Sequence, residues 1–207
     1  MARDDERKAR AQETPVVSGL PDVPGIIVAM SLSPGLATHL RGLADELLVK
    51  EFPGSTLTRA ERELVATVVS AENDCFYCMD SHGAFATELL SRAHADDAKS
   101  QVEAAKTGRL DAFSPRMSAL LHLARTVQRR SRDVTRADVE KALTAGASDG
   151  DTQLTVLIAS AFCMYNRMVD GLRAKTPPSA EAFVARAKEI AEHGYSDARV
   201  QSIPGAR

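Results

Sequence analysis

The sequence predicts an all-α fold: a helical bundle of about seven helices, in which one helical hairpin carries a C-x-x-C pair. Apolar residues recur at the three- and four-residue spacing of amphipathic helices along most of the chain, and the alternation typical of strands is almost absent. Residues that favour helix N-caps precede several of these stretches. Together these observations favour helices packed on helices around one core.

Length and composition limit the class of protein. The 207 residues are 44% hydrophobic and the formal net charge is −2, which provides for a core and gives no overall field for nucleic acid or a membrane. No apolar run is long enough to span a bilayer and no secretory signal is visible, so we expect a cytoplasmic protein. We expect one domain over residues 16–207, preceded by a polar tail, residues 1–15, that is disordered or arm-like because it buries little apolar surface.

The first confident helix is expected after an irregular lead-in. Residues 16–34 contain several prolines and short apolar runs, which favour at most one short helix. Ser33 is a candidate N-cap with Pro34 at the first helical position. Leucines then recur at helical spacing until the break at Phe52, so the helix is expected to end there.

Two helices joined by a short turn come next. The first is capped by Thr58 or Ser55 and ends where Asn73 offers turn chemistry. The second is expected to begin with Asp74 as its cap and to run to about His94. These two helices form the predicted hairpin.

The second half of the chain repeats this pattern. Four more helices are expected from their apolar spacing and their cap or stop signals. One begins at Ser114 and Pro115 and runs through Val127, one begins at Thr135 with Asp138 in a capping box and stops at Gly146, one spans residues 153–172, and one runs from Ser179 toward Gly194.

Redox, acid–base and turn residues are concentrated between Glu63 and His82. Cys75, Cys78 and His82 fall at relative positions 0, 3 and 7, which lie on one face of a helix, so we expect all three side chains to point into one pocket. If Asp74 caps that helix, Cys75 lies in its first turn, where free backbone N–H groups lower the pKa of a thiol. Glu63, on the preceding helix, would meet His82 and orient its ring.

This arrangement predicts thiol redox chemistry, because in a reducing compartment a C-x-x-C pair is catalytic or binds metal. An imidazole four residues after Cys78 can accept the thiol proton, which leaves the thiolate as nucleophile. Cys78 would attack the terminal oxygen of a hydroperoxide and become a sulfenic acid. Cys75 would condense with it to a disulfide and release water, and an outside dithiol would reset the pair.

The same segment resembles a known family. Glu63 twelve positions before Cys75, followed by C-x-x-C and by His82 and Gly83, is similar to the motif of the alkylhydroperoxidase D-like branch of the carboxymuconolactone decarboxylase family. The similarity runs over about 21–177 and is closest to the peroxidase-related subgroup. It implies an all-α fold, assembly into homo-oligomers, and peroxide reduction without haem, metal or any other cofactor.

The resemblance also implies a role for each residue. Cys78 corresponds to the peroxidatic cysteine and Cys75 to the resolving cysteine, while Glu63 and His82 correspond to the proton relay. One position differs, because the best-characterised branch has a second histidine immediately before the second cysteine and this sequence has Tyr77 there. A phenol does not shuttle protons near neutral pH as imidazole does, so Tyr77 is expected to be a pocket wall or ordinary core.

Other interpretations of these residues stay open. The pair would also serve a dithiol oxidoreductase or redox sensor whose substrate is not a peroxide. A zinc-stabilised interaction module would use both cysteines and His82 as ligands, with Glu63, His94 or Cys163 as the fourth. Two core cysteines at helical spacing are the plainest alternative. The family name also covers lactone decarboxylases, but that reaction has no need for a dithiol.

The remaining expectations concern partners and the apolar helix over 153–172. The chemistry requires a hydroperoxide substrate and a lipoyl or thioredoxin-like dithiol as reductant, and the apolar helices favour a homo-oligomer. Nothing in the sequence favours a nucleic-acid or membrane partner. Cys163 is expected to be an inert buried thiol. Asn166 and Arg167 are polar positions in this helix, which either bridge subunits or line the pocket.

Overall fold

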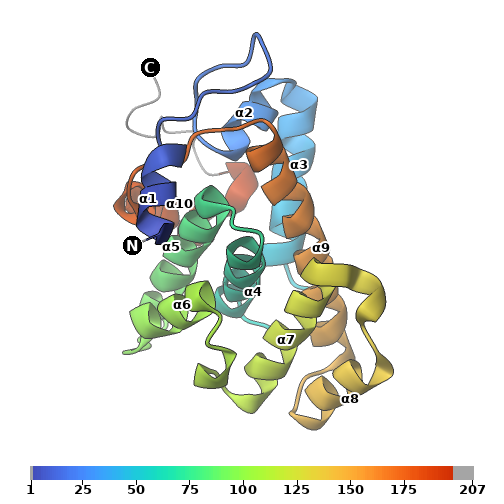
Figure 1. Ribbon diagram of the computed structural model, residues 1–207. Coiled ribbons are helices and arrows are strands. Elements are labelled where there is room, and N and C mark those ends of the chain that lie inside the picture. Colours follow the sequence, from blue (N-terminus) through green and yellow to red (C-terminus); the bar gives the residue numbers. More distant parts are fainter. Residues whose placement is uncertain (1, 198–207) are drawn as a thin grey trace.

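The computed structural model describes residues 2–197, and over this range the chain is all-helical (Figure 1). This confirms the predicted fold class. The helices are α1 (Ala2–Arg10), α2 (Ile26–Ser31), α3 (Pro34–Leu48), α4 (Arg59–Glu72), α5 (Phe76–Arg92), α6 (Ala98–Thr107), α7 (Pro115–Arg130), α8 (Arg136–Thr144), α9 (Asp149–Gly171) and α10 (Val184–Asp197), with short 3₁₀ helices η1 (Leu110–Ala112), η2 (Ser131–Asp133) and η3 (Ala180–Phe183).

The described residues hold ten α-helices rather than about seven. α2 is the short helix that the lead-in allows, whereas α1 and α6 lie outside the predicted set. α6 buries only small side chains and Val102, so its own apolar pattern is weak and packing stabilises it. Helix α9 begins earlier than expected, at Asp149, because Ser148 forms a capping box with Asp151.

The N-terminal residues form helix α1, so of the two expectations for the tail, disordered or arm-like, the arm is what the structure has. Its order comes from charged contacts with distant residues. Arg7 Nε lies 3.1 Å from Asp80 Oδ2, and Arg10 Nη1 lies 3.0 Å from Asp170 Oδ1. Both guanidinium groups also stand over the ring of Phe76, at 5.7 and 5.4 Å from its centroid. Composition gives no sign of this arm because its partners lie far away in the chain.

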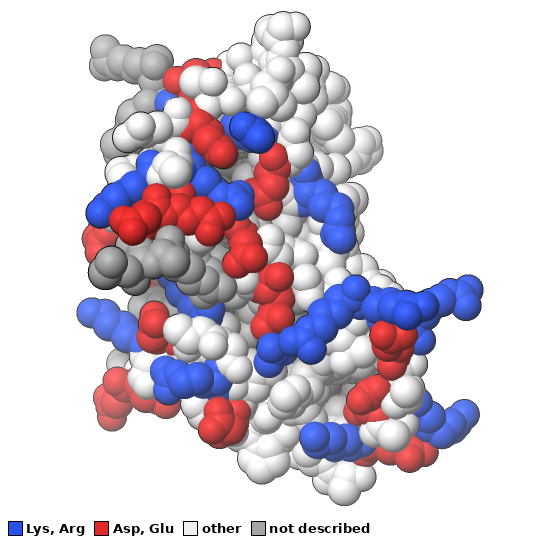
Figure 2. Space-filling model, in the orientation of Figure 1, with Lys and Arg blue, Asp and Glu red and all other residues white. Residues whose placement is uncertain are grey.

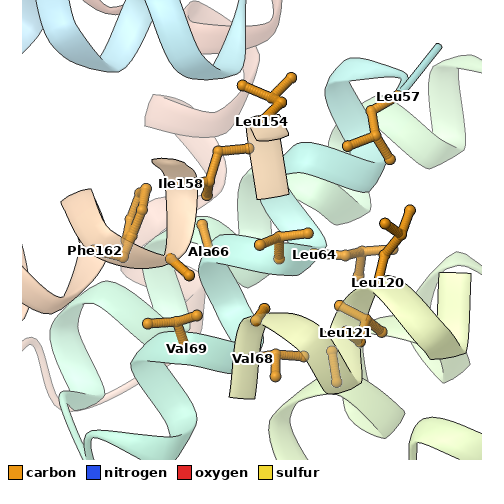
Figure 3. Packing of buried hydrophobic residues seen from close by; sticks show 14 of the residues in the cluster. Leu57, Leu64, Ala66, Val68, Val69, Leu120, Leu121, Leu154, Ile158 and Phe162 are labelled. Carbon is orange, nitrogen blue, oxygen red and sulfur yellow. The ribbon is translucent and has the colours of Figure 1, made fainter. Parts of the chain in front are cut away.

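The main core surrounds α4. Almost every side chain of this helix from Ala60 to Ala71 is buried, and α4 packs against α5, α7 and α9. Figure 3 shows how the three helices α4, α7 and α9 interdigitate through Leu64, Val68, Val69, Leu120, Leu121, Leu154, Ile158 and Phe162. Because α4 lies at the centre, polar side chains that it carries, such as Glu63, are held inside the protein.

The turn between α4 and α5 differs from the prediction in one respect. Asp74 does not cap α5; it adopts a left-handed conformation with φ of 54° and ends α4. Its N–H bonds to the carbonyl of Ala71, and the N–H of Cys75 bonds to that of Ser70 at 3.0 Å, which is the Schellman arrangement. Cys75 is therefore the N-cap of α5, one residue before its first turn.

The predicted caps of several other helices are confirmed. Ser33 caps α3 with Pro34 at its start, and Ser114 caps α7 in the same way. Thr58, not Ser55, caps α4. Thr135 caps α8 and forms a capping box with Asp138. The residue types alone were sufficient to predict these caps, because each cap joins groups that are only three residues apart.

The molecular surface carries no large field of one sign on the face drawn in Figure 2, where acidic and basic side chains are interspersed. Among the helices of residues 2–197, none combines the length and the apolar character that crossing a membrane requires.

Candidate functional site

Glu63 and His82 lie in contact at the centre of the site. Helix α4 presents Glu63 to α5, and Glu63 Oε2 is 2.7 Å from His82 Nδ1. Tyr195 of α10 donates its hydroxyl to the other carboxylate oxygen, Oε1, at 2.6 Å, and its oxygen is 3.3 Å from His82 Nδ1. Each oxygen of the buried carboxylate thus faces one donor. The expected contact of Glu63 with His82 forms, and Tyr195 is an additional member.

The ring of His82 is oriented by aromatic packing as well. It meets Phe162 edge to face with centroids 4.5 Å apart, and Phe85 at 5.3 Å. Because Nδ1 faces the carboxylate of Glu63, it carries the ring hydrogen in the neutral tautomer, and Nε2 is left as the acceptor. The histidine therefore offers one fixed nitrogen for proton transfer.

Cys78 and Cys75 pack in the same buried cluster, but only one of them lines a cavity. Cys78 lines a small cavity together with His82, and only 3% of it is exposed. Cys75 is fully buried, lies outside the cavity lining, and packs in a cluster with Val28 and Val169. Of the three side chains expected in one pocket, Cys78 and His82 line the cavity, whereas Cys75 packs beside Cys78 outside its lining.

The environment of Cys75 also reverses the expected direction of its pKa. A side-chain hydrogen bond with Cys78 and burial raise the pKa of the Cys75 thiol, and the nearby charge of Asp170 adds to this. The carboxylate of Asp170 is itself hydrogen-bonded to Cys75, and burial raises the pKa of Asp170. Cys75 is thus held as a thiol rather than a thiolate, which suits a resolving cysteine better than an attacking one.

The cavity beside Cys78 has two lobes. The inner lobe has a volume of about 50 Å³ and the outer lobe about 90 Å³, and His82 and Tyr195 line both. The rest of the wall is mostly apolar, with two arginines. The outer lobe is lined by Ile26, Ile27, Met30, Arg41, Tyr77, Ser81, His82, Phe85, Phe183, Arg186, Ile190 and Tyr195.

Tyr77 is a wall of this cavity. It lines both lobes, and its ring meets Phe183 edge to face at 5.3 Å. Burial raises the pKa of Tyr77, so the phenol stays protonated and acts as a hydrogen-bond donor at most. Gly25 makes room for the ring: a Cβ at that position would lie 2.2 Å from Tyr77 Cζ, and its φ is +58°.

Tyr195 is the residue that sequence reasoning missed. Its backbone N–H bonds to Asp45 Oδ1 of α3 at 2.6 Å, and the preceding Gly194 takes φ of 74°, which turns the chain so that the phenol enters the site. Arg59 of α4 holds the same helix by bonding the carbonyls of Ile190 and Ala191. The Gly-Tyr pair at the end of a helix was the only local signal.

Asn166 and Arg167, the two polar residues singled out in α9, make different contacts. Asn166 is buried, donates to Ser70 Oγ at 3.1 Å and accepts from Asn73 at 2.8 Å, so it fastens α9 to the turn that precedes Cys75. Arg167 is exposed and bonds its own helix. Neither lines the cavity.

Cys163 is half-buried rather than fully buried, because it lies on a flank of α9. Asn73 Nδ2 lies 3.8 Å from its sulfur.

The described part of the chain contains no set of side chains arranged as ligands for a metal ion. No group of three or more His, Cys, Asp and Glu side chains there is arranged to hold an ion. Glu63 contacts His82 but the two cysteines are engaged with each other and with Asp170. The zinc-site interpretation therefore finds no geometric support within residues 2–197.

Fold and site together define a class: an all-helical protein with a dithiol at the start of one helix and a Glu-His pair beside it. Comparison with known proteins supports the fold and indicates a family resemblance. Residues 34–126, a little under half of the chain, match the model of the Carboxymuconolactone decarboxylase family. No curated protein matches the sequence.

Two solved structures are similar over most of the chain. One is described as the alkylhydroperoxidase AhpD core, an uncharacterized peroxidase-related protein from Ralstonia eutropha JMP134; it is 25% identical, with a TM-score of 0.65, and the match covers 80% of this chain and 82% of that one. The other, an uncharacterized peroxidase-related protein from Silicibacter sp. TM1040, is 25% identical with the same TM-score and coverages of 84% and 93%. The chain is therefore similar to the Carboxymuconolactone decarboxylase family over residues 34–126, and it resembles the two peroxidase-related structures in fold.

Proposed function

We propose that this protein reduces hydroperoxides through the dithiol of Cys75 and Cys78. The observation that carries the proposal is the cavity that Cys78 shares with His82, whose ring is held by Glu63 at 2.7 Å. A nucleophile beside an oriented base is the arrangement that activates a thiol. The description of the two similar structures as peroxidase-related supports the same class of reaction.

The first step oxidises Cys78. His82 Nε2 accepts the thiol proton, and the thiolate attacks the terminal oxygen of the hydroperoxide. The O–O bond breaks, the alkoxide leaves and takes the proton from His82, and Cys78 becomes a sulfenic acid while the peroxide becomes an alcohol. Glu63 stabilises the imidazolium while it carries the proton.

The second step forms the disulfide. The sulfur of Cys75 attacks that of Cys78, the S–O bond breaks, and the hydroxide leaves as water with the proton of the Cys75 thiol. The carboxylate of Asp170, which is hydrogen-bonded to Cys75, is the group placed to accept that proton on its way. An external dithiol, lipoyl or thioredoxin-like, then reduces the disulfide by two exchanges and becomes a disulfide itself. Homo-oligomer formation remains part of this proposal.

Rapid oxidation of the cysteines by tert-butyl hydroperoxide tests the proposal. The chain has no tryptophan, so the reaction is best followed by quenched-flow alkylation and peptide mass. The reduced wild-type protein is expected to form the Cys75–Cys78 disulfide, Cys78→Ser to lose the reaction, and the control Cys163→Ser to react as wild type. Unchanged peroxide consumption by Cys78→Ser would contradict the proposal.

Turnover separates the peroxidase from the alternative of a dithiol oxidoreductase or sensor. With excess dihydrolipoamide and hydroperoxide, a peroxidase consumes many equivalents of peroxide per protein. A sensor is oxidised once and then consumes no more.

A further inference from the structure

The cavity beside Cys78 carries charges of one sign. Arg41 of α3 and Arg186 of α10 both line its outer lobe, and Arg41 also lines the inner one. Within the described part of the chain, neither lobe has an aspartate or glutamate in its wall. The remaining lining is apolar or aromatic, apart from Ser81 and His82. The wall therefore combines two guanidinium groups with apolar surface.

The carboxylate of Glu63 is shielded from this cavity. Glu63 is 1% exposed, and its two oxygens are engaged by His82 and Tyr195, which stand between it and the lobes. The negative charge of Glu63 is therefore compensated by His82 and Tyr195. An anion in the outer lobe would meet the guanidinium groups first.

The two arginines also influence each other. Burial lowers the pKa of Arg186, and the charge of Arg41 lowers it further, against opposing effects of Tyr77, Tyr195 and Glu189. A ligand anion in the cavity would pair with the guanidinium group of Arg41 and lie near that of Arg186, which lines the same outer lobe. The side chain of Arg41 makes no hydrogen bond or ion pair with any other residue of the range 2–197.

We infer that the cavity binds an organic hydroperoxide that carries a carboxylate, with the carboxylate on Arg41 and Arg186 and the hydroperoxide group toward Cys78. This inference rests on the proposed function, whose substrate class it narrows. The apolar wall formed by Ile26, Met30 and Phe85 contacts the hydrocarbon part. Volumes of about 50 and 90 Å³ suit a short, branched substrate better than a long acyl chain.

Three matched probes test this inference. They are 3-hydroperoxy-3-methylbutanoate, its methyl ester, and tert-butyl hydroperoxide, which share the tertiary hydroperoxide and differ in the charged group. The wild-type protein is expected to react with the acid about tenfold faster than with the ester, because a charge-assisted hydrogen bond is available only to the acid. Equal rate constants for acid and ester would overturn the inference and leave the proposed function intact.

Variants of the arginines locate the effect. Arg41→Gln and Arg186→Gln are each expected to lower the ratio of the rate constant for the acid to that for tert-butyl hydroperoxide about tenfold. Arg186→Lys, which keeps a charge, should retain part of the preference and guards against misfolding of the neutral variant. Arg167→Gln is the matched control, since Arg167 is exposed and lies outside the cavity lining. An equal loss in this control would overturn the assignment to the cavity.

A binding measurement separates the two possible failures. The product alcohol 3-hydroxy-3-methylbutanoate contains no peroxide, and it should slow alkylation of Cys78 in the reduced protein more than its methyl ester does. If this protection is seen while all three hydroperoxides fail to oxidise Cys78, the proposed function fails and the carboxylate site stands. If neither compound protects Cys78, the carboxylate site is refuted whatever the peroxidase result.

Discussion

Replacing Tyr195 with phenylalanine should destabilise the fold by more than a buried Tyr→Phe change usually does. The hydroxyl of Tyr195 donates to Glu63 Oε1 at 2.6 Å, and that carboxylate is 1% exposed. Burial and the neighbouring Glu63 raise the pKa of Tyr195, so the phenol keeps its proton and remains a donor. A hydrogen bond to a charged group contributes about 1.5–3 kcal/mol, and the free energy of unfolding should fall by about that amount.

Tyr165 provides the matched control. Its hydroxyl is also directed inward, but it donates to a neutral acceptor, the carbonyl of Leu40, at 2.8 Å. A hydrogen bond between neutral groups contributes only about 0.5–1.5 kcal/mol. Both variants remove one hydroxyl from a packed aromatic ring, so their difference reports on the acceptor rather than on the volume lost.

Urea unfolding followed by circular dichroism at pH 7 measures both variants. Tyr195→Phe should lose about 1 kcal/mol more than Tyr165→Phe, with unchanged dependence on urea concentration. If Tyr195→Phe is as stable as Tyr165→Phe or more so, the carboxylate of Glu63 does not depend on this donor. The arrangement of Glu63, His82 and Tyr195 would then be refuted.

Three further predictions follow from other parts of the structure. Asp151→Asn should lower the free energy of unfolding at pH 7 by about 3 kcal/mol, because the buried carboxylate accepts from both the loop before α4 and the start of α9. Burial acts to raise the pKa of Asp151 but these hydrogen bonds lower it below its ordinary value, so its stabilising effect is present above about pH 4 and the difference from wild type, measured by urea unfolding, should shrink as pH falls further. Gly25→Ala should lower the melting temperature more than Gly19→Ala, since both glycines have positive φ but only the first would place a Cβ 2.2 Å from a tyrosine ring; equal losses would contradict the clash. Iodoacetamide at pH 8 should modify half-buried Cys163 before buried Cys75, whose pKa is raised by its hydrogen bond with the second cysteine and by burial, and peptide mass showing the opposite order would contradict this account.

Local signals predicted the parts of the fold that depend on short sequence separations. The caps Ser33, Thr58 and Ser114 act on groups three residues away, so their residue types suffice. The contact of Glu63 with His82 was also predictable, since the turn between α4 and α5 makes the two helices antiparallel neighbours. These inferences needed no knowledge of the rest of the chain.

The start of α5 shows where local reasoning fails. An aspartate before a helix is usually its N-cap, but Asp74 instead takes the left-handed conformation that ends α4. Both uses suit the same residue type, and only the packing of the two helices decides between them. Cys75 then lies at the N-cap instead of in the first turn, and its hydrogen bond with Cys78 and its burial raise the pKa of the thiol.

Long-range partners account for the other omissions. Tyr195 reaches Glu63 across 132 residues, and Arg10 reaches Asp170 across 160. No periodicity or spacing rule links such positions. The polar residues of α1 therefore suggested a disordered or arm-like tail, whereas Arg7 and Arg10 pair with Asp80 of α5 and Asp170 of α9.

Trapping the first oxidation product tests the central claim, that Cys78 is the residue attacked by hydroperoxide. Cys75→Ser removes the resolving thiol, so the sulfenic acid should persist and react with dimedone. After one equivalent of tert-butyl hydroperoxide, peptide mass is expected to show the dimedone adduct on Cys78 and none on Cys163. An adduct on Cys163, or no adduct on either cysteine, would contradict the account.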